Sequence, residues 1–294
     1  ACVLNVAQRA YELGRGVDIK CQFTFNAEYI PERIFLACET PEIFTITLNG
    51  KAVDKTDCGY FRDHSFRMLN IADLVVKGEN VIELQVYLKE TDEVYENLKK
   101  SRIFESEKNK LTFDTEIEPM YLVGDFGVKA DGKFEAIPNK AYFYEGGFAL
   151  VEAPKTLTLK EIEKQGLLFF SGEVTLKKTV TLDGAPCCLK FDKKGINAIR
   201  VKVNGKAVRT VMWTPFEVDI SEYVVAGENE IELTLVNNLR NLMGPHHRHD
   251  PEPMGVGPGT FSFEKEWNGR ECGGYRFFGS DARHCLYRCK RQNN

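Results

Sequence analysis

The sequence lacks the features that mark several protein classes. It has no run of about 18 apolar residues, so no membrane span is expected. A net charge of −4 gives no general field for polyanions, so no nucleic-acid partner is expected. Helical signals are few: 158–166 favours a short helix, and 93–104 favours a helix or a crossing loop. A catalytic (β/α)₈ barrel, which needs about 250 residues of alternating strands and helices, is therefore excluded.

Cysteine is present without a recognisable framework. The nine cysteines are odd in number, and their spacings, including the adjacent Cys187 and Cys188, fit neither a disulfide scaffold nor a Cys-x-x-Cys zinc site. Cys21, Cys38 and Cys187 fall in apparent strands, where cysteine acts as a small buried hydrophobe. Reduced thiols, and hence a cytoplasmic setting, are expected, with a secreted parent as the alternative.

The two ends of the chain give weaker indications. The chain begins with Ala and shows no signal peptide, so we expect a piece of a longer protein or one trimmed at its start. The basic run 282–294 is typical of a solvated tail, and nucleic-acid binding by so short a run is a weaker alternative.

One phrase occurs twice. Residues 44–53 read FTITLNGKAV and residues 199–208 read IRVKVNGKAV. Each copy leads through a short segment, NIAD at 70–73 or DISE at 219–222, to a Gly-Glu-Asn triplet and an alternating strand. The Asn-Gly pairs are 155 residues apart and the triplets 149 apart, so the period is a whole domain. The repeat therefore predicts two copies of one domain.

Each copy has the pattern of a half-buried antiparallel sheet. In the strand after each triplet, apolar side chains alternate with polar ones, as at Ile82 and Leu84 or Ile231 and Leu233. The Asn-Gly pairs suit a type I′ turn, because both central residues of that turn need positive φ. Further strands are predicted at 20–26, 33–38, 110–117, 120–126, 172–182, 187–191 and 275–278.

These elements define the predicted fold class, which is all-β with two tandem β-sandwiches of jelly-roll or Greek-key type. With 43% hydrophobic residues the chain can bury two ordinary cores. We place the first sandwich at residues 1–135 and the second, with a C-terminal loop extension, at 136–294. The two are expected to join near 130–145, where Asp131-Gly132, Pro138 and Gly146-Gly147 cluster.

The quoted blocks resemble the sugar-binding, galactose-binding-like β-sandwich domain of glycoside hydrolase family 2. The second copy carries that signature as VNGKAV, Trp213-Thr214-Pro215-Phe216, Asp219-Ile220 and the triplet at 227–229. The first copy gives LNGKAV, Tyr60-Phe61 with Ser65-Phe66, and the triplet at 78–80, but it lacks the Pro and has Asn70 in place of the Asp. The phrases MYLVGDFGV (120–128) and LRNLMGPHH (239–247) look like the C-terminal part of large bacterial proteins related to α-L-rhamnosidases, the family 106-like group. Together the likeness covers most of residues 20–250.

That resemblance implies an accessory role beside a catalytic barrel, because such sandwiches usually accompany one. The expected partners are therefore a glycan and the catalytic domain of a longer parent protein. The function expected first is a non-catalytic carbohydrate-binding or scaffolding region of a rhamnosidase-like glycoside hydrolase. The alternatives are a glycosidase that uses loop carboxylates as acid and base, and a protein-interaction module that binds no sugar.

Sugars bind to an aromatic face together with planar polar groups. Of the two tryptophans, Trp267 is the better stacking candidate, because its surroundings are polar and loop-like. Trp213 is also a carbohydrate-binding candidate, although its motif favours a structural role as a cap beside Phe216. The other candidate carbohydrate-binding residues are Asn268, Arg270, Tyr275, Arg276, Asn241, His246 and His247.

The segment 244–253, GPHHRHDPEP, is the densest polar cluster. His246, His247, His249 and Asp250 offer the ligand types of a transition-metal site, but three prolines and an arginine favour an ordinary loop. No metal site or cofactor is therefore assigned, although a structural Ca²⁺ is possible in a lectin-like sandwich. The Asp-Gly pairs at 131 and 183 are better interpreted as turns.

Catalysis would need two carboxylates roughly 5–10 Å apart across a glycosidic bond. The acidic residues available are Glu145, Glu173, Asp250, Glu252, Glu264, Glu266 and Asp281. No spacing in the sequence pairs any two of them, so no catalytic residue is assigned.

Overall fold

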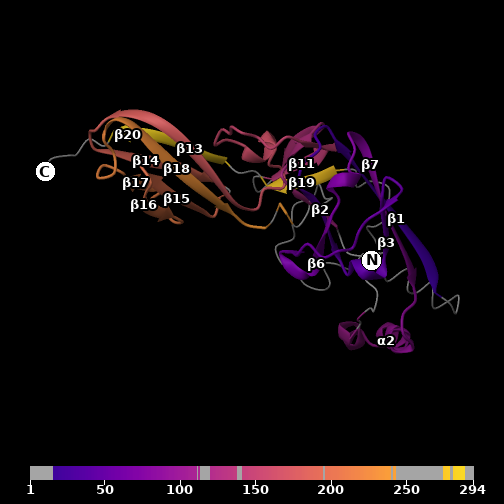
Figure 1. Ribbon diagram of the computed structural model, residues 1–294. Helices are drawn as coiled ribbons and strands as arrows, with labels where there is room; N and C mark the ends of the chain where they lie inside the picture. The colour runs from indigo at the N-terminus through magenta and orange to yellow at the C-terminus, as the bar shows by residue number, and fades with distance from the viewer. Residues whose placement is uncertain are drawn as a thin grey trace. The chain divides into compact units, whose positions relative to one another are not determined.

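The computed structural model describes residues 16–110, 112, 120–137, 141–194, 196–239, 241–242, 274–278 and 281–288, the last two ranges by their backbone alone. Strands dominate these residues, and α2 (Asp92–Ile103) is the one α-helix among them (Figure 1). The chain divides into two compact units, 1–126 with 150–152 and 127–149 with 153–294. The all-β class is confirmed, and none of the described helices is long and apolar enough to cross a membrane.

The first unit contains two antiparallel sheets. In one, neighbouring strands follow the order β4-β3-β7-β1-β12, and in the other β5-β6-β2-β8. Side chains from both sheets are buried, including Leu48 and Leu84 on the first and Leu36 and Leu69 on the second. The strands are β1 (Val17–Ala27), β2 (Ile34–Glu39), β3 (Thr45–Leu48), β4 (Lys51–Ala52), β5 (Tyr60–Phe61), β6 (Asp63–Asn70), β7 (Gly78–Leu88), β8 (Tyr121–Gly124) and β12 (Phe148–Val151).

The second unit contains a sandwich around one apolar core. Its four-stranded sheet has the order β13-β18-β15-β16, and β17-β14-β20 form a second sheet. Val201 and Leu233 from the first sheet and Leu189 and Val218 from the second belong to one buried cluster. The strands are β13 (Gly172–Asp183), β14 (Cys187–Lys194), β15 (Ala198–Val203), β16 (Lys206–Val211), β17 (Glu217–Asp219), β18 (Ala226–Asn237) and β20 (Asp281–Arg288).

The repeated Asn-Gly pairs form the turns that the sequence predicts. Asn49 and Gly50 have φ values of 53° and 76°, and Asn204 and Gly205 have 51° and 77°. Such positive values suit the two central residues of a type I′ turn. The first pair joins β3 to β4 and the second joins β15 to β16.

The first copy departs from the family signature at Asn70 without changing the turn. Asn70 Oδ1 accepts a hydrogen bond from the Ala72 amide at 3.0 Å, and Asp219 Oδ1 accepts one from the Ser221 amide at 2.9 Å. Both side chains therefore make the same two-residue turn that Asp and Asn favour. The substitution of Asn for Asp keeps the acceptor that this turn requires.

The segment expected to join the two domains forms strands instead. β9 (Gly127–Ala130), β10 (Lys133–Ile137) and β11 (Ala141–Glu145) lie there, and β19 (Gly274–Phe278) pairs with β11. The predicted boundary between 135 and 136 therefore falls inside β10. The reason is an aromatic cluster in which Tyr144 is fully buried, with Phe134 and Phe148 packed against it. The Gly-rich turns connect these strands and do not form a linker between the domains.

The helical predictions hold in part. Within 93–104 the chain forms α2, whose Val94, Leu98 and Ser101 are buried on one side at helical spacing. Within 158–166 only a 3₁₀ turn, η4 (Ile162–Gln165), forms. The other 3₁₀ turns are η1 (Pro41–Ile43), η2 (Ala72–Leu74) and η3 (Glu105–Lys110). The strand predicted at 110–117 lies almost entirely outside the described residues, and the other predicted strands are confirmed.

Cys21, Cys38, Cys58, Cys187 and Cys188 carry thiols rather than disulfides. Cys38 and Cys187 are buried, as expected of small hydrophobes in strands.

Candidate functional site

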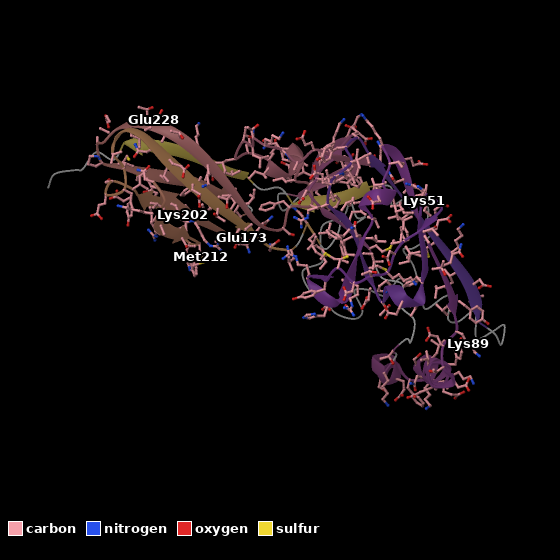
Figure 2. All side chains as sticks on the ribbon, viewed as in Figure 1. Lys51, Lys89, Glu173, Lys202, Met212 and Glu228 are labelled. Carbon is pink, nitrogen blue, oxygen red and sulfur yellow. The ribbon has the colours of Figure 1, made fainter. Side chains whose placement is uncertain are left out.

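Trp213 lies in the connection between β16 and β17 and is 66% exposed. Met212 beside it is 47% exposed and projects from the second unit (Figure 2). Phe216, three residues further on, is half-buried against the core. The expected structural cap is therefore supplied by Phe216, and the prediction that Trp213 packs beside it as a cap is wrong. The indole is instead available to a ligand.

Strand register places Trp213 at one end of the second sandwich. Val211 pairs with Ile199, and Ile199 pairs with Leu235, so the chain beyond Val211 leaves the sheet where β18 approaches its last residue. The repeated Gly-Glu-Asn triplet lies at the other end of β18, and Figure 2 shows Glu228 far from Met212. The exposed indole thus belongs to a different end of the sandwich from the turn network of the repeat.

Polar side chains follow β18 at that same end. Asn237 Nδ2 donates to the Phe170 carbonyl at 3.2 Å, and Asn237 Oδ1 accepts from the Asn238 amide at 2.9 Å. Asn241 is 4% exposed, so it is buried rather than open to a ligand. Of the two candidates Trp213 and Asn241, only Trp213 is therefore at the surface.

The remaining carbohydrate-binding candidates are not placed at a site by the described residues. Trp267, Asn268, Arg270, His246 and His247 lie outside those residues. Tyr275 and Arg276 lie in β19, where their backbones pair with Tyr144 and Phe143. Among the acidic candidates, Asp250, Glu252, Glu264 and Glu266 lie outside the described residues, and Asp281 is placed by its backbone in β20.

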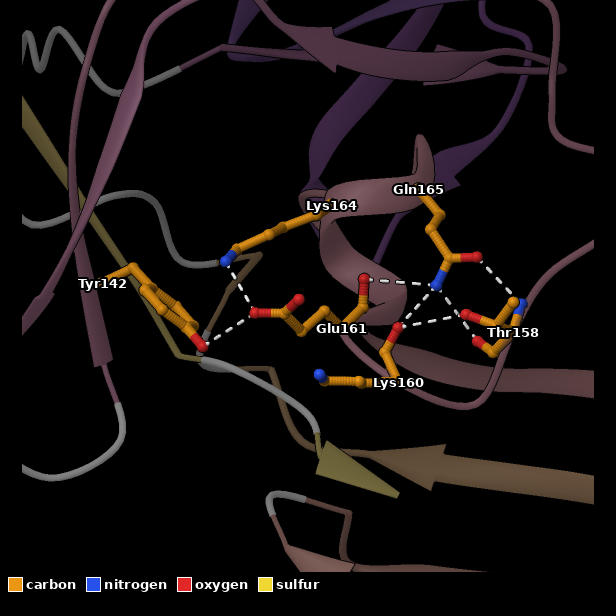
Figure 3. Close-up of polar contacts among 6 residues, drawn as sticks. All are labelled: Tyr142, Thr158, Lys160, Glu161, Lys164 and Gln165. Atoms are coloured by element: carbon orange, nitrogen blue, oxygen red, sulfur yellow. Dashed lines mark hydrogen bonds and ion pairs between the residues drawn. The ribbon is translucent and has the colours of Figure 1, made fainter. Parts of the chain in front are cut away.

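A polar cluster surrounds Glu161 in the second unit (Figure 3). Glu161 Oε1 accepts hydrogen bonds from Lys164 Nζ at 2.7 Å and from the Tyr142 hydroxyl at 3.1 Å. Lys164 Nζ lies 4.0 Å from the centroid of the Tyr142 ring. The hydrogen bond from Lys164 holds the pKa of Glu161 below its ordinary value, and burial raises the pKa of Tyr142. At neutral pH this carboxyl group is therefore an ionised anchor for the 158–165 segment.

The outer face of the four-stranded sheet carries ion pairs. Arg200 Nη1 donates to Glu173 Oε2 at 2.8 Å, and a second bond joins the same two groups. Lys177 and Lys202 approach Glu232 at 2.8 and 2.9 Å. Hydrogen bonds from these cations lower the pKa values of Glu173 and Glu232. A glycosidase acid needs a raised pKa, so this face has the chemistry of a solvated surface.

Within the described ranges, no group of three or more His, Cys, Asp or Glu side chains could hold a metal ion. Asp183-Gly184 forms a turn, as predicted, because Asp183 Oδ1 accepts from the Ala185 amide at 3.0 Å. Asp131-Gly132 connects β9 to β10, and Asp131 Oδ1 accepts from the distant Gly147 amide at 2.7 Å. A structural Ca²⁺ stays a prediction.

Sequence reasoning quoted Tyr60 only as part of the family signature and named neither Tyr60 nor His64 as a site residue. Their rings lie with centroids 3.9 Å apart and planes tilted by 37°, and Tyr60 is 49% exposed. The signal that could have found them is the position of His64 in the repeat, six residues before Asn70, as Trp213 stands six residues before Asp219.

No protein-family model matches the chain, and no curated protein matches it. Three solved structures that match are a Streptomyces avermitilis α-L-rhamnosidase complexed with L-rhamnose, a β-D-mannosidase from Dictyoglomus thermophilum and a rhamnosidase from Novosphingobium sp. PP1Y. Their identities are 10, 15 and 15%, and their TM-scores are 0.30, 0.23 and 0.26. They cover 75, 75 and 77% of this chain.

The chain spans only 22, 24 and 18% of those three structures, or about a fifth of their length. TM-scores of this size do not establish a common fold, so the fold assignment rests on the strand pairing described above. The class that the described residues define is an all-β protein of two units, each with antiparallel sheets that carry buried side chains.

Proposed function

We propose that the chain is a non-catalytic carbohydrate-binding region of a rhamnosidase-like glycoside hydrolase. Its ligand is a glycan, and its further partner is the catalytic domain of a longer parent protein. The observation that carries this proposal is the 66% exposure of Trp213 at one end of the second sandwich.

An exposed indole suits a sugar for a physical reason. The C–H face of a pyranose is apolar, and an indole offers it a flat surface for dispersion contact and burial of apolar area. Met212, 47% exposed beside it, extends the apolar surface. Because a polyol keeps most of its hydration at such a shallow surface, we expect weak binding to one sugar and stronger binding to a clustered glycan.

A glycosidase within this chain is less well supported. The described carboxyl groups of Glu161, Glu173 and Glu232 have lowered pKa values because Lys or Arg donates a hydrogen bond to each. A general acid needs the opposite shift. The third alternative is a module that binds protein alone. It rests on the same exposed side chains, and a test of glycan binding distinguishes it from the proposed function.

The test is a glycan-array screen of the purified chain beside its Trp213→Ala variant. Val225→Ala is the matched control, because Val225 is 56% exposed and lies at the opposite end of the second sandwich. We expect the wild type and the control to bind the same glycans, and Trp213→Ala to lose signal by about tenfold.

Two outcomes contradict the proposal. Absence of binding to every glycan by the wild type would move the assignment to a protein-binding scaffold. Hydrolysis of an array glycan by the wild type would move it to the glycosidase alternative. If the wild type binds and Trp213→Ala binds equally well, the Trp213 site is wrong even though the function stands.

A further inference from the structure

Tyr60 and His64 form an exposed aromatic pair at the edge of the first unit. Tyr60 lies in β5 and His64 in β6, and their ring planes are tilted by 37° with centroids 3.9 Å apart. Tyr60 is 49% exposed, and His64 is exposed as well. At this centroid distance the two rings face each other, so His64 backs one side of Tyr60 and the exposed outer side of the pair is left for a ligand.

His64 of this pair stands at the position of Trp213 in the repeat. In the first unit Phe35 pairs with Asn70, and Asn70 closes the turn that Asp219 closes in the second unit. Counting back six residues from each turn leads to His64 in one copy and to Trp213 in the other. Both copies thus place an exposed aromatic side chain shortly before the same turn.

Polar groups of both signs flank the pair. The guanidinium of Arg62 lies 5.6 Å from the centroid of the Phe61 ring. Arg67, which pairs with Tyr60 across the strands, forms an ion pair with Asp57. Asp63 Oδ1 accepts hydrogen bonds from the amide and the hydroxyl of Ser65, each at 2.9 Å.

The balance of charge around the pair indicates which class of ligand it suits. Planar carboxylate and guanidinium groups beside an aromatic face match the hydroxyl groups and the apolar face of a sugar ring. A polyanion is disfavoured, because Asp57 and Asp63 offset Arg62 and Arg67, and nucleic-acid binding needs a clear excess of positive charge.

We infer that Tyr60 and His64 form a second glycan-binding site, for an uncharged sugar ring, in the first unit. This inference rests on the proposed function and extends it, because it gives the chain two sites instead of one.

The experiment uses the full chain on a printed array of rhamnose-, mannose- and galactose-terminated glycans. It compares the wild type with Trp213→Ala, Tyr60→Ala and the double variant. Tyr87→Ala is the matched control, because Tyr87 is a tyrosine of the same unit that is 57% exposed. Circular dichroism of each variant shows whether the strands are retained.

We expect Trp213→Ala to keep part of the array signal, and the added Tyr60→Ala change to reduce that remainder by about tenfold. Tyr87→Ala should leave the signal unchanged. A Trp213→Ala variant that loses all binding, with Tyr60→Ala equal to the wild type, would overturn the second site and leave the proposed function intact.

Two other results separate the proposals further. If Trp213→Ala binds as the wild type does and Tyr60→Ala abolishes binding, the result supports the site at Tyr60 and His64 and contradicts the site at Trp213. A wild type that binds no glycan overturns both proposals.

Discussion

Asn204 and Asn229 are joined through their side chains, with Asn204 Nδ2 donating to Asn229 Oδ1 at 2.9 Å. Asn49 and Asn80 make the same contact at 2.9 Å in the first unit. Asn229 also closes its own loop, since its Nδ2 donates to the carbonyls of Val225 and Gly227 at 2.8 and 3.0 Å. In each unit, therefore, the Asn of the Asn-Gly pair and the Asn of the Gly-Glu-Asn triplet bond to each other through their side chains.

Replacing Asn229 with Ala should destabilise the second unit by about 2–4 kcal/mol. Asn229 is 0% exposed, so the Val225 amide loses an acceptor, and two carbonyls lose a donor, where little water can replace it. Urea unfolding followed by tryptophan fluorescence measures this effect, because both tryptophans lie in the sequence of the second unit.

The matched control for that change is Glu228→Ala, one residue away and exposed, which should cost less than about 0.5 kcal/mol. Equal urea midpoints for the two variants would show that the Asn pair does not stabilise the unit. Asn80→Ala is the corresponding change in the first unit, and circular dichroism follows its unfolding.

Gly205→Ala should cost about 1–2 kcal/mol through the backbone alone. Gly205 has φ of 77°, and no atom lies within 4 Å of where a Cβ would be placed, so the variant meets strain rather than a clash. Gly205→Asn should cost less, because Asn tolerates the left-handed region better than Ala. Thermal unfolding of the two variants compares them, and an Ala variant as stable as the Asn variant would refute the strain argument.

The parts of the fold that could be predicted from sequence are those with local causes. Period-two alternation identifies β7 and β18, because each residue's burial follows from its side of the pleat. Asn-Gly identifies both hairpins, because positive φ is a property of the turn itself. Neither inference needs knowledge of which strands face each other.

The parts that could not be predicted depend on distant packing. The hydroxyl of Tyr144 bonds the backbone of Gly132 and of Gly147, and no local pattern predicts these contacts. The exposure of Trp213 depends on Phe216 occupying the core edge instead, which aromatic residue type alone does not decide. Asn241 resembled a surface sugar ligand by composition, yet it is 4% exposed. For the candidate site, sequence therefore supplied the aromatic residue but not which side chains surround it.

Tyr144→Phe should destabilise the second unit by about 1–2 kcal/mol. The fully buried hydroxyl accepts from the Gly132 amide at 2.8 Å and donates to the Gly147 carbonyl at 2.6 Å, and Phe leaves both groups without it. Tyr142→Phe, on the same strand, is the control: its hydroxyl is only half-buried and makes one bond, to Glu161, so the loss should be smaller. Urea midpoints that rank the two variants the other way would contradict this account.

The same hydroxyl predicts a dependence on alkaline pH. Burial raises the pKa of Tyr144 above its ordinary value of 10.0, so the unfolded chain releases this proton before the folded chain does. The contribution to stability is therefore fully present below about pH 10 and is lost as pH rises from there towards the folded pKa. Urea unfolding from about pH 8 to 11 should show a steeper loss for the wild type than for Tyr144→Phe. Identical slopes would mean that Tyr144 does not control this range.

Cys38 and Cys58 should differ sharply in reactivity towards alkylating agents. Burial raises the pKa of Cys38 to about 11, and its side chain is 2% exposed, so little thiolate forms and little reagent reaches it. Cys58, in the loop before β5, is exposed. A short pulse of iodoacetamide at about pH 8, followed by peptide mass mapping, should label Cys58 and leave Cys38 unmodified until urea is added. Labelling of Cys38 at the rate of Cys58 in the native protein would mean that β2 opens readily, because a thiol held in a closed core reacts only through such opening.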